Sequence, residues 1–326
     1  MRRREFIRLS AGAAAAWPLA GRAQQATAPL IGFMSSRSSG DSAGGLAAFR
    51  KGLGESGLIE GKNFSIEFRW AGGAYDRLPA LARELVNRRV AVLVAVGGDP
   101  SAQAGKAATS TIPIVFASTD PVKSGLVASL SRPGGNATGV YIPTADLEEK
   151  RIGLLSEVFP GKGLFGALLN PKYPTVDQQE REFKDGARKI GRPFVVVNAS
   201  TDAELDEAFV SLAQQHVEAI SVAADPFFDT RRKRIIALAA QHKMPALYQF
   251  REYTTDGGLR SYGVSFSEAY HQVGIYTARV FKGTKPAELP VMQTTKFELV
   301  INMKTAKMLG LSLPSGVLAI ADEVIE

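Results

Sequence analysis

Short apolar runs alternate with amphipathic stretches along most of the chain. Residues 90–96 (VAVLVAV) are apolar throughout, as expected for a central parallel strand that is covered on both faces. In residues 64–68 apolar side chains alternate with polar ones, which is the period of a half-buried strand. Between them, residues 75–88 place leucines at helical spacing, so this region is predicted to form a strand, a helix and a second strand.

The same two patterns continue through the rest of the chain. We expect strands over residues 29–34, 64–68, 90–96, 112–117, 164–169, 194–197, 219–223, 246–250 and 296–301, with a further short run at 138–142. We expect helices over residues 45–56, 75–88, 101–109, 122–130, 146–158, 175–190, 202–216, 228–242, 267–281 and 304–309. Such alternation predicts an α/β fold with two parallel, doubly wound, Rossmann-like sheets and right-handed crossovers.

The length of the chain, 326 residues, exceeds what one hydrophobic core usually serves, so two lobes are expected. We expect three hinge crossings between the lobes, near residues 141, 263 and 292. The expected N-terminal lobe is residues 29–141 with 263–291, and the expected C-terminal lobe is residues 142–262 with 292–326. Several crossings restrict the lobes to hinge closure about a cleft.

The first residues have the three parts of an export signal. Three arginines, Arg2 to Arg4, precede a short alanine-rich stretch, and Ala23 offers a small residue for cleavage. The pair Arg3-Arg4 followed by Glu5-Phe6-Ile7 fits the twin-arginine variant, which carries folded proteins; a disordered basic tail is the alternative. We therefore expect residues 1–23 to be a cleavable signal and the protein to work in the periplasm.

This leader carries much of the charge of the chain. The whole sequence has a formal net charge of +7, and residues 1–23 hold five arginines and one glutamate, which is +4. The remaining chain is therefore near +3 (7 minus 4), which does not indicate a nucleic-acid-binding protein. No later apolar run is long enough to span a membrane, so we expect a protein that is not membrane-spanning. We also expect it to be a monomer.

The residues that covalent or metal-dependent catalysis needs are not found together. The chain has no cysteine, and its three histidines, His216, His242 and His271, stand at scattered helical positions. A GxGxxG sequence from Gly52 to Gly57 follows a helix and precedes a strand, the reverse of the order that a dinucleotide site requires. We therefore expect no cofactor, no metal and no enzymatic activity.

Four of the expected strands end in the same way, with Asp or Asn followed by Pro. The four sequences are Gly98-Asp99-Pro100, Thr119-Asp120-Pro121, Leu169-Asn170-Pro171 and Ala224-Asp225-Pro226. Asp and Asn accept hydrogen bonds from free helix N–H groups, and Pro in the first turn loses none, so these are good helix starts. Because ligands bind beyond the carboxyl ends of parallel strands, the same N-termini also offer N–H groups to an anion. Both interpretations stay open.

Two further strand ends carry candidate ligand contacts. The hydroxyl-rich loop of residues 35–41 has the donors to hold a carboxylate, with Arg37 adding charge. In the second lobe, Tyr248 and Phe250 offer aromatic surface, and Glu252 suits an ammonium group. The structural alternatives are a plain surface loop in the first case and packed core aromatics in the second.

Three segments together resemble a known family. They are the head RRREFIRLSAGAAAAWPLAGRAQQ, the middle IPIVFASTDPVKSGLVASLSRPGGNATGV and the end TKFELVINMKTAKMLGL with ADEVIE. In these segments the chain is similar to ABC-transporter substrate-binding proteins of the tryptophan/tyrosine-type group, and the similarity runs over essentially the whole chain. The resemblance implies a type I periplasmic binding protein-like fold and capture of a small solute for a membrane permease with its ATPase.

The resemblance also implies positions for the ligand contacts, with the α-carboxylate held by loops of the N-terminal lobe. The implied residues are Ser35, Ser36, Gly98, Asp99, Ser101, Thr119 and Asp120 in the first lobe and Asn170, Asp225 and Tyr248 in the second. Many relatives carry Thr or Ser where this chain has Asp99. An added carboxylate there repels an anionic ligand or favours a cationic group.

The sequence therefore predicts a non-enzymatic binding protein for an ABC importer, closing on a small amino-acid-like or carboxylate-bearing solute. A periplasmic ligand sensor subunit for a signalling receptor is an alternative of another class. An exported α/β enzyme is the third, and it requires a nucleophile–base or metal constellation that the sequence does not show.

Overall fold

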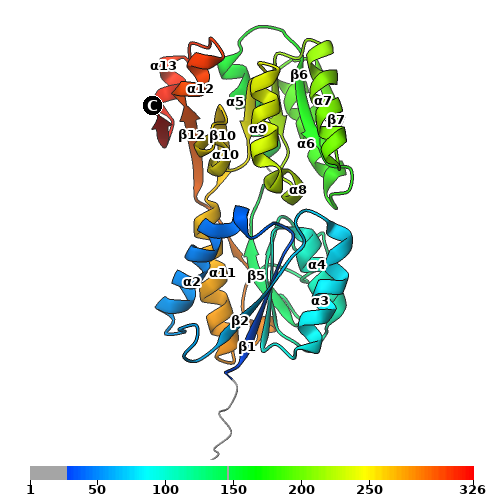
Figure 1. Ribbon diagram of the computed structural model, residues 1–326, viewed down its shortest axis with the longest axis vertical. Helices are drawn as coiled ribbons and strands as arrows, with labels where there is room; N and C mark the ends of the chain where they lie inside the picture. Colours follow the sequence, from blue (N-terminus) through cyan, green and yellow to red (C-terminus); the bar gives the residue numbers. More distant parts are fainter. Residues whose placement is uncertain (1–27, 145–146) are drawn as a thin grey trace, which may run out of the picture.

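Two α/β lobes lie one above the other along the long axis of the molecule (Figure 1). The computed structural model describes residues 28–144 and 147–326 of the chain, so the expected export signal, residues 1–23, lies outside the described residues. Each lobe contains one sheet with helices on both faces (Figure 1). The predicted fold class, two lobes built on doubly wound sheets, is confirmed.

The first lobe is built on a six-stranded sheet with the order β11-β5-β4-β3-β1-β2. Its strands are β1 (Leu30–Ser35), β2 (Ser65–Trp70), β3 (Val92–Val96), β4 (Ile114–Ser118), β5 (Ala137–Tyr141) and β11 (Met292–Gln293). Its helices are η1 (Gly40–Ser42), α2 (Ala43–Glu55), η2 (Tyr75–Arg77), α3 (Leu78–Asn87), α4 (Asp99–Ala108), α11 (Phe266–Phe281) and η4 (Pro286–Glu288). Strands β3 and β4 are buried along their whole length, as the continuous apolar run of residues 90–96 predicts for the centre of a sheet.

The second lobe is built on a seven-stranded sheet with the order β13-β12-β10-β9-β8-β6-β7. Its strands are β6 (Phe165–Leu169), β7 (Phe194–Asn198), β8 (Ala219–Val222), β9 (Ala246–Tyr248), β10 (Arg260–Val264), β12 (Phe297–Asn302) and β13 (Glu323–Ile325). Its helices are α5 (Glu148–Val158), α6 (Val176–Lys189), α7 (Asp202–Gln214), α8 (Pro226–Thr230), α9 (Arg232–Gln241), α10 (Arg251–Thr255), α12 (Met303–Met308) and α13 (Ser315–Ala319).

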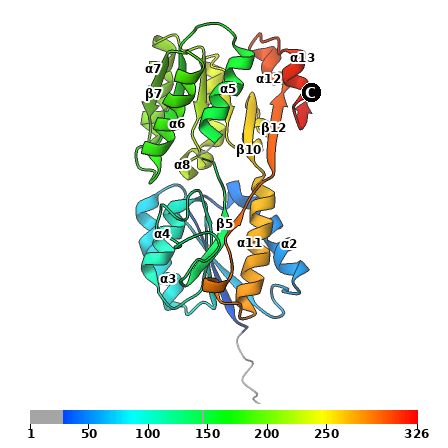
Figure 2. The ribbon, with the colours of Figure 1, turned by 180° about the vertical axis from the view of Figure 1, so that it is seen from behind.

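The chain passes between the two sheets after β5, after β10 and after β11 (Figure 2). The joining segments are hydrogen-bonded to one another. The backbone N–H of Thr294 donates to the carbonyl oxygen of Tyr141 at 3.0 Å, and that of Ser265 donates to the carbonyl oxygen of Lys296 at 3.2 Å. The connection between the lobes is therefore a short bundle of paired strands and not a single flexible linker.

Two strands of the second sheet, β12 and the strand β13 that pairs parallel with it, run against the predicted parallel direction. β12 pairs with β10 in antiparallel register, with Phe297 opposite Val264. The other crossover-connected strands of this sheet, β6 to β10, run toward the first lobe, whereas β12 begins where the chain arrives from that lobe. It therefore has to run away from the lobe interface, and the sheet is mixed.

The predicted helix over residues 122–130 does not form. Its residues make a short series of turns. A first turn closes when the N–H of Ser124 donates to the carbonyl oxygen of Asp120, but Gly125 then adopts a φ of +71°. This left-handed conformation ends a helix, so the apolar residues Leu126 and Val127 are buried from a loop instead.

The GxGxxG sequence has a packing role. A Cβ atom on Gly52 would lie 2.2 Å from the carbonyl oxygen of His271, and one on Gly274 would lie 2.2 Å from that of Phe49. Helices α2 and α11 therefore approach each other through two glycines, and this close contact requires Gly52 for a reason unrelated to nucleotides.

Candidate ligand-binding site

A pocket lies between the two lobes, at the carboxyl ends of the strands of both sheets. We call it the cleft pocket, and it spans about 400 Å³ of space between protein atoms, including space that is open to solvent. Its lining residues are Arg37, Gly97, Gly98, Ala117, Ser118, Thr119, Ile142, Thr144, Tyr173, Ala224, Asp225, Pro226, Asp229, Phe250, Phe266 and Tyr270. The location is where α/β sheets bind ligands, because loops after neighbouring strands converge there.

Asp99 organises the wall that the first lobe contributes. Its buried carboxylate accepts hydrogen bonds from the hydroxyls of Ser118 and Thr119, from the backbone N–H of Thr119 at 2.9 Å, and from the Tyr173 hydroxyl at 3.4 Å. Its oxygen atoms are therefore satisfied by protein groups. Asp99 holds Ser118 and Thr119 in place at the pocket surface while its own side chain does not line the pocket.

The loop after β1 is braced by its serines. The Ser35 hydroxyl oxygen accepts the backbone N–H of Arg37 at 3.1 Å, and the Ser36 hydroxyl lies 2.7 Å from that of Ser101 on α4. All three serines are buried behind the wall. Their hydrogen bonds fix the backbone so that Arg37 is the residue of this loop that reaches the pocket.

Arg37 crosses the pocket to the second lobe. One terminal nitrogen, Nη2, lies 2.6 Å from Oδ2 of Asp229 on α8, and both side chains are buried. The Arg37 Nε makes no hydrogen bond to any residue within the described ranges. A buried N–H donor at the wall of a cavity is costly unless a ligand or water satisfies it.

Asp225 is the main acidic group of the opposite wall. Its Oδ1 accepts the backbone N–H groups of Phe227 at 2.7 Å and Phe228 at 3.2 Å, which caps helix α8. Its Oδ2 accepts the Tyr75 hydroxyl from the first lobe at 2.8 Å and the Asn170 amide at 3.1 Å. Burial raises the pKa of Asp225 to about 7.

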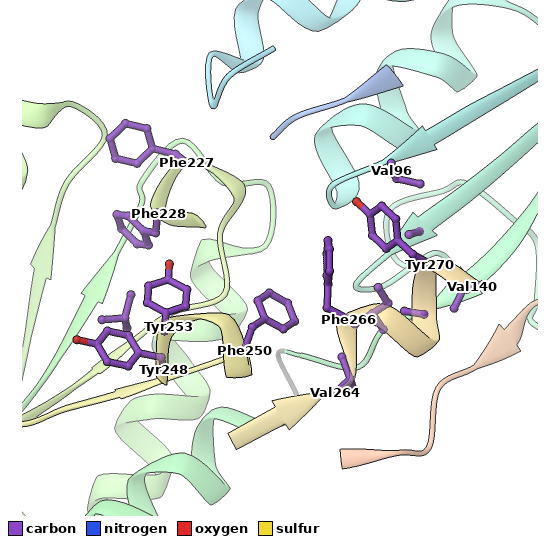
Figure 3. Close-up of a cluster of buried hydrophobic side chains, with 14 of the residues drawn as sticks. Val96, Val140, Phe227, Phe228, Tyr248, Phe250, Tyr253, Val264, Phe266 and Tyr270 are labelled. Atoms are coloured by element: carbon purple, nitrogen blue, oxygen red, sulfur yellow. The ribbon is translucent and has the colours of Figure 1, made fainter. Parts of the chain in front are cut away.

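Aromatic rings line the side of the pocket next to the crossing segments. Figure 3 shows Phe250 of the second lobe and Phe266 of the first facing each other, with Tyr270 beyond Phe266 on the same helix. The Phe250 and Phe266 ring centroids are 5.6 Å apart, and those of Phe266 and Tyr270 are 4.2 Å apart. The pocket therefore combines charged walls with an apolar end.

The structure separates the ten predicted contact residues into three groups. Gly98, Thr119 and Asp225 line the cleft pocket. Five others lie behind its walls and hold the lining residues: Ser35, Ser36, Asp99, Ser101 and Asn170. Asp120 and Tyr248 lie away from it.

The expectation that Tyr248 reaches the ligand is corrected. Tyr248 is fully buried, stacks on Tyr253 with ring centroids 4.6 Å apart, and borders a different pocket, next to Met308. Figure 3 shows its hydroxyl directed away from Phe250 and Phe266. β9 ends at Tyr248, and the chain then turns so that Phe250 faces the cleft instead.

The Asp-Pro signature also gives different results at the four strand ends. Asp225 alone among the four caps a helix with its side chain, whereas α4 begins at Asp99 without a side-chain cap. Asp120 accepts the N–H of Lys123 at 3.0 Å in a turn outside the pocket, and Asn170 accepts that of Lys172 at 3.0 Å. Local capping preference therefore does not decide which of these side chains faces the cleft.

Several lining residues carried no clear signal in the sequence. Phe266 and Tyr270 belong to the apolar face of α11, where aromatic residues are ordinary core residues. Asp229 and Tyr173 follow their strands by several residues. Tyr75 does not line the pocket, but its hydroxyl reaches the lining residue Asp225 from the first lobe. The four-residue spacing of Phe266 and Tyr270 was the one available clue, because it places both rings on the same face of a helix.

Two α/β lobes that are joined by several crossing segments and enclose a charged and aromatic pocket define a two-lobed solute-binding protein. The family model described as ABC transporter substrate binding protein matches residues 33–325, and the chain belongs to this family. The predicted family is thereby confirmed. Because the members of this family bind substrates, the chain is a binding protein and not an enzyme. Substrate-binding proteins of ABC systems act outside the cytoplasm.

Relatives of known structure or function agree with this assignment. A tyrosine-binding protein from Clostridioides difficile is 28% identical over 266 residues, which are 81% of this chain and 75% of that protein. A crystal structure of a conserved domain protein from Vibrio cholerae superposes with a TM-score of 0.84 at 29% identity, covering 91% of this chain and 99% of that one. An ABC domain from Streptococcus pneumoniae in complex with L-Trp gives 0.83 at 26% identity, again covering 91% and 99%.

Within the described ranges, no helix combines the length and the apolar character needed to cross a membrane. Over the same residues, no three acidic, histidine or cysteine side chains gather in a way that would hold a metal ion.

Proposed function

We propose that this protein captures a small amino acid in the cleft pocket and delivers it to an ABC permease with its ATPase. The observation that carries the proposal is the opposed charge of the two pocket walls: cationic and N–H donor groups on the first lobe, and carboxylates on the second. An α-amino acid has the same two charges a few bonds apart.

The carboxylate of the ligand is placed on the first lobe. Gly97 and Gly98 line the pocket directly before α4, and Gly98, with a φ of +96°, has no side chain between the pocket and the start of the helix. The first-turn N–H groups of a helix have no intrahelical partner and carry partial positive charge, which favours an anion. The Arg37 Nε adds a further donor.

The ammonium group is placed on the second lobe, beside Asp225. Its Oδ2 already accepts two hydrogen bonds from neutral donors, Tyr75 and Asn170, and both orient it without neutralising its charge. An ammonium group at this oxygen would compensate a buried carboxylate, which is expensive to leave unpaired.

Closure of the two lobes over the ligand couples capture to delivery. We propose that the lobes are residues 29–141 with 263–291 and residues 142–262 with 292–326, and that they move about the crossing segments as a hinge. The ligands named for the two relatives, tyrosine and L-Trp, support an amino acid. The arginine pair at Arg3 supports export of a folded monomer to the periplasm by the twin-arginine route.

A ligand screen tests the proposal. At a ligand concentration of about 100 Kd, binding should stabilise the protein by about 2.7 kcal/mol, which is several degrees in Tm. We expect at least one of the standard amino acids to do this in a thermal-shift screen, with Kd then measured by calorimetry. Asp225→Asn should weaken that Kd at least tenfold, because the ammonium loses a charged acceptor.

Asp256→Asn is the matched control, since Asp256 belongs to the same lobe but pairs with Arg232 outside the pocket at 2.8 Å. It should leave Kd unchanged. A screen in which no amino acid raises Tm would contradict the proposal. So would equal affinities in the Asp225→Asn variant and the wild type. Uptake of the ligand in vesicles that carry the permease separates import from a sensing role.

A further inference from the structure

The aromatic end of the cleft pocket is filled by a side chain of the protein itself. The guanidinium carbon of Arg37 lies 4.1 Å from the centroid of the Phe266 ring and 5.1 Å from that of Phe250. The two rings contact each other edge-on, with centroids 5.6 Å apart, and the planar guanidinium lies against both of them. It therefore covers the ring surface on which an aromatic ligand would stack. The place that an indole or phenol group needs is therefore taken.

The second lobe holds Arg37 there. Oδ2 of Asp229 forms an ion pair with Nη2 of Arg37 at 2.6 Å. The other carboxylate oxygen, Oδ1, accepts hydrogen bonds from the Gln249 amide at 2.7 Å and from the Tyr253 hydroxyl at 3.3 Å. All four side chains are buried. To displace Arg37 would leave Asp229 buried without its cation, which weakens the binding of any ligand that requires the displacement by on the order of a hundredfold.

The space that remains is small. With Arg37 in place, the cavity volume of the cleft pocket is about 30 Å³. A single water needs about 10–15 Å³ of such a cavity, so this volume corresponds to two or three waters and leaves no room for a ring system beside the arginine.

We propose that Arg37 is a specificity-determining residue that excludes aromatic side chains, so that the ligand of this protein is an amino acid with a short, non-aromatic side chain. This inference rests on the proposed function and sharpens it. The predicted preference differs from the ligands named for two relatives, tyrosine and L-Trp, whose sequences are 28% and 26% identical to this chain where they align.

Removal of the pair tests the inference. The double variant Arg37→Ala with Asp229→Asn empties the space beside the Phe250 and Phe266 rings without leaving an unpaired buried charge. Calorimetry with alanine, serine, leucine, phenylalanine and tryptophan should show that the wild type prefers the short side chains at least tenfold over tryptophan. In the double variant, the ratio of the tryptophan Kd to the alanine Kd should fall at least tenfold relative to the wild type. Loss of the Arg37 Nε donor affects every amino acid alike and cancels in this ratio.

A second arginine–aspartate pair gives the matched control. Arg231 also bridges the lobes, over the Phe227 ring at 4.4 Å, with Asp202 at 3.0 Å and the Gly72 carbonyl oxygen at 2.8 Å, but it does not line the cleft pocket. The double variant Arg231→Ala with Asp202→Asn should keep the wild-type order of preference. Circular dichroism of both double variants establishes that they are folded.

The outcomes separate the two proposals. A wild type that binds tryptophan as tightly as short amino acids overturns the inference and leaves the proposed function standing. A wild type that binds no amino acid, together with a double variant that gains aromatic ligands, refutes the proposed function and supports the role of Arg37. A folded double variant in which this Kd ratio does not fall overturns the inference, and if that variant does not fold, the wild-type preference alone decides it.

Discussion

Asp99 and Asp225 show how the same local sequence can give an aspartate two different structural roles. Each follows a strand and precedes a proline. Asp99 faces the hydroxyls of the neighbouring strand end and takes most of its hydrogen bonds from its own lobe, so it supports the wall. Asp225 faces the interface, where the Tyr75 hydroxyl reaches it from the other lobe. The difference arises from what lies opposite each carboxylate after folding.

The buried carboxyl of Asp225 leads to a prediction about pH. Its pKa is about 7 in the folded protein and near 3.8 when solvent-exposed, as in the unfolded chain. Between these values the folded state holds a proton that the unfolded state has lost, so the free energy of unfolding falls as pH rises from about 4 to about 7. In the ligand-free protein, the free energy of unfolding of the Asp225→Asn variant should decrease less over this pH range than that of the wild type.

Urea denaturation at intervals between pH 4 and pH 8 measures how the free energy of unfolding depends on pH in the wild type and in the variant. A part of the slope should remain in the variant, because burial also raises the pKa of Glu148 to about 7. Identical slopes in the two proteins would contradict the assignment of the titration to Asp225.

At the scale of elements, helix α5 is tied to the segments that join the lobes. The Nε of Arg151 donates to the carbonyl oxygen of Tyr262 at 2.9 Å, and its Nη1 donates to that of Thr144 at 3.2 Å. The same side chain pairs with Glu148 at 2.7 Å, and both are fully buried. Thr144 lines the cleft pocket, and Tyr262 lies just before the crossing after β10. Arg151 thus links the pocket to two crossing segments.

We therefore expect Arg151→Met to affect both stability and binding. The change leaves Glu148 buried without a partner, which should cost roughly 3–5 kcal/mol of unfolding free energy. It also frees the crossing segments, so ligand affinity should fall at least fivefold. Chemical denaturation and calorimetry measure the two effects separately.

Arg260 serves as the control for this change. Arg260 is likewise fully buried and contacts α5, donating to the carbonyl oxygen of Leu154 at 2.9 Å and lying 3.8 Å from Glu157. Among the described residues, neither of these partners belongs to a crossing segment. Arg260→Met should lower stability while leaving the affinity of the folded protein near that of the wild type. Equal losses of affinity in the two variants would show that Arg151 acts through general destabilisation.

The elements themselves were largely predictable. Residues 90–96 contain β3 because a continuous apolar run at the centre of a sheet needs both faces covered. Residues 122–130 contain no helix because the left-handed Gly125 stops one, although the leucine and valine spacing favours it. The antiparallel direction of β12 was not predictable, since it depends on the side from which the chain enters the second lobe.

At the scale of the whole molecule, the two lobes meet through polar contacts across the cleft and through the crossing segments beside it. The Tyr75–Asp225, Arg37–Asp229 and Arg231–Gly72 contacts each join one lobe to the other. A ligand that pairs with these groups contacts both lobes at once. Under the proposed function, binding in this way would become a change of shape that the permease recognises.

The proposed export by the twin-arginine route also concerns the whole chain, because this route carries proteins that are already folded. Arg3→Lys together with Arg4→Lys should leave the precursor in the cytoplasm. Cell fractionation locates the protein, and its size on a gel shows whether the signal has been cleaved. Arg22→Lys, a change of the same kind near the expected cleavage point, should leave export intact. Normal periplasmic delivery of the double variant would refute the twin-arginine assignment.

The sequence by itself determined the α/β fold of two lobes, the family and the strand ends at which the pocket lies. These follow from hydrophobic periodicity and from the geometry of parallel sheets, which are properties of segments a few residues long. The tertiary structure alone decided that Arg37 fills the aromatic end, that Asp229 holds it there, and that Tyr248 points away. Such contacts join residues of different lobes, so no local pattern records them, and the packing of one lobe on the other determines which polar groups meet.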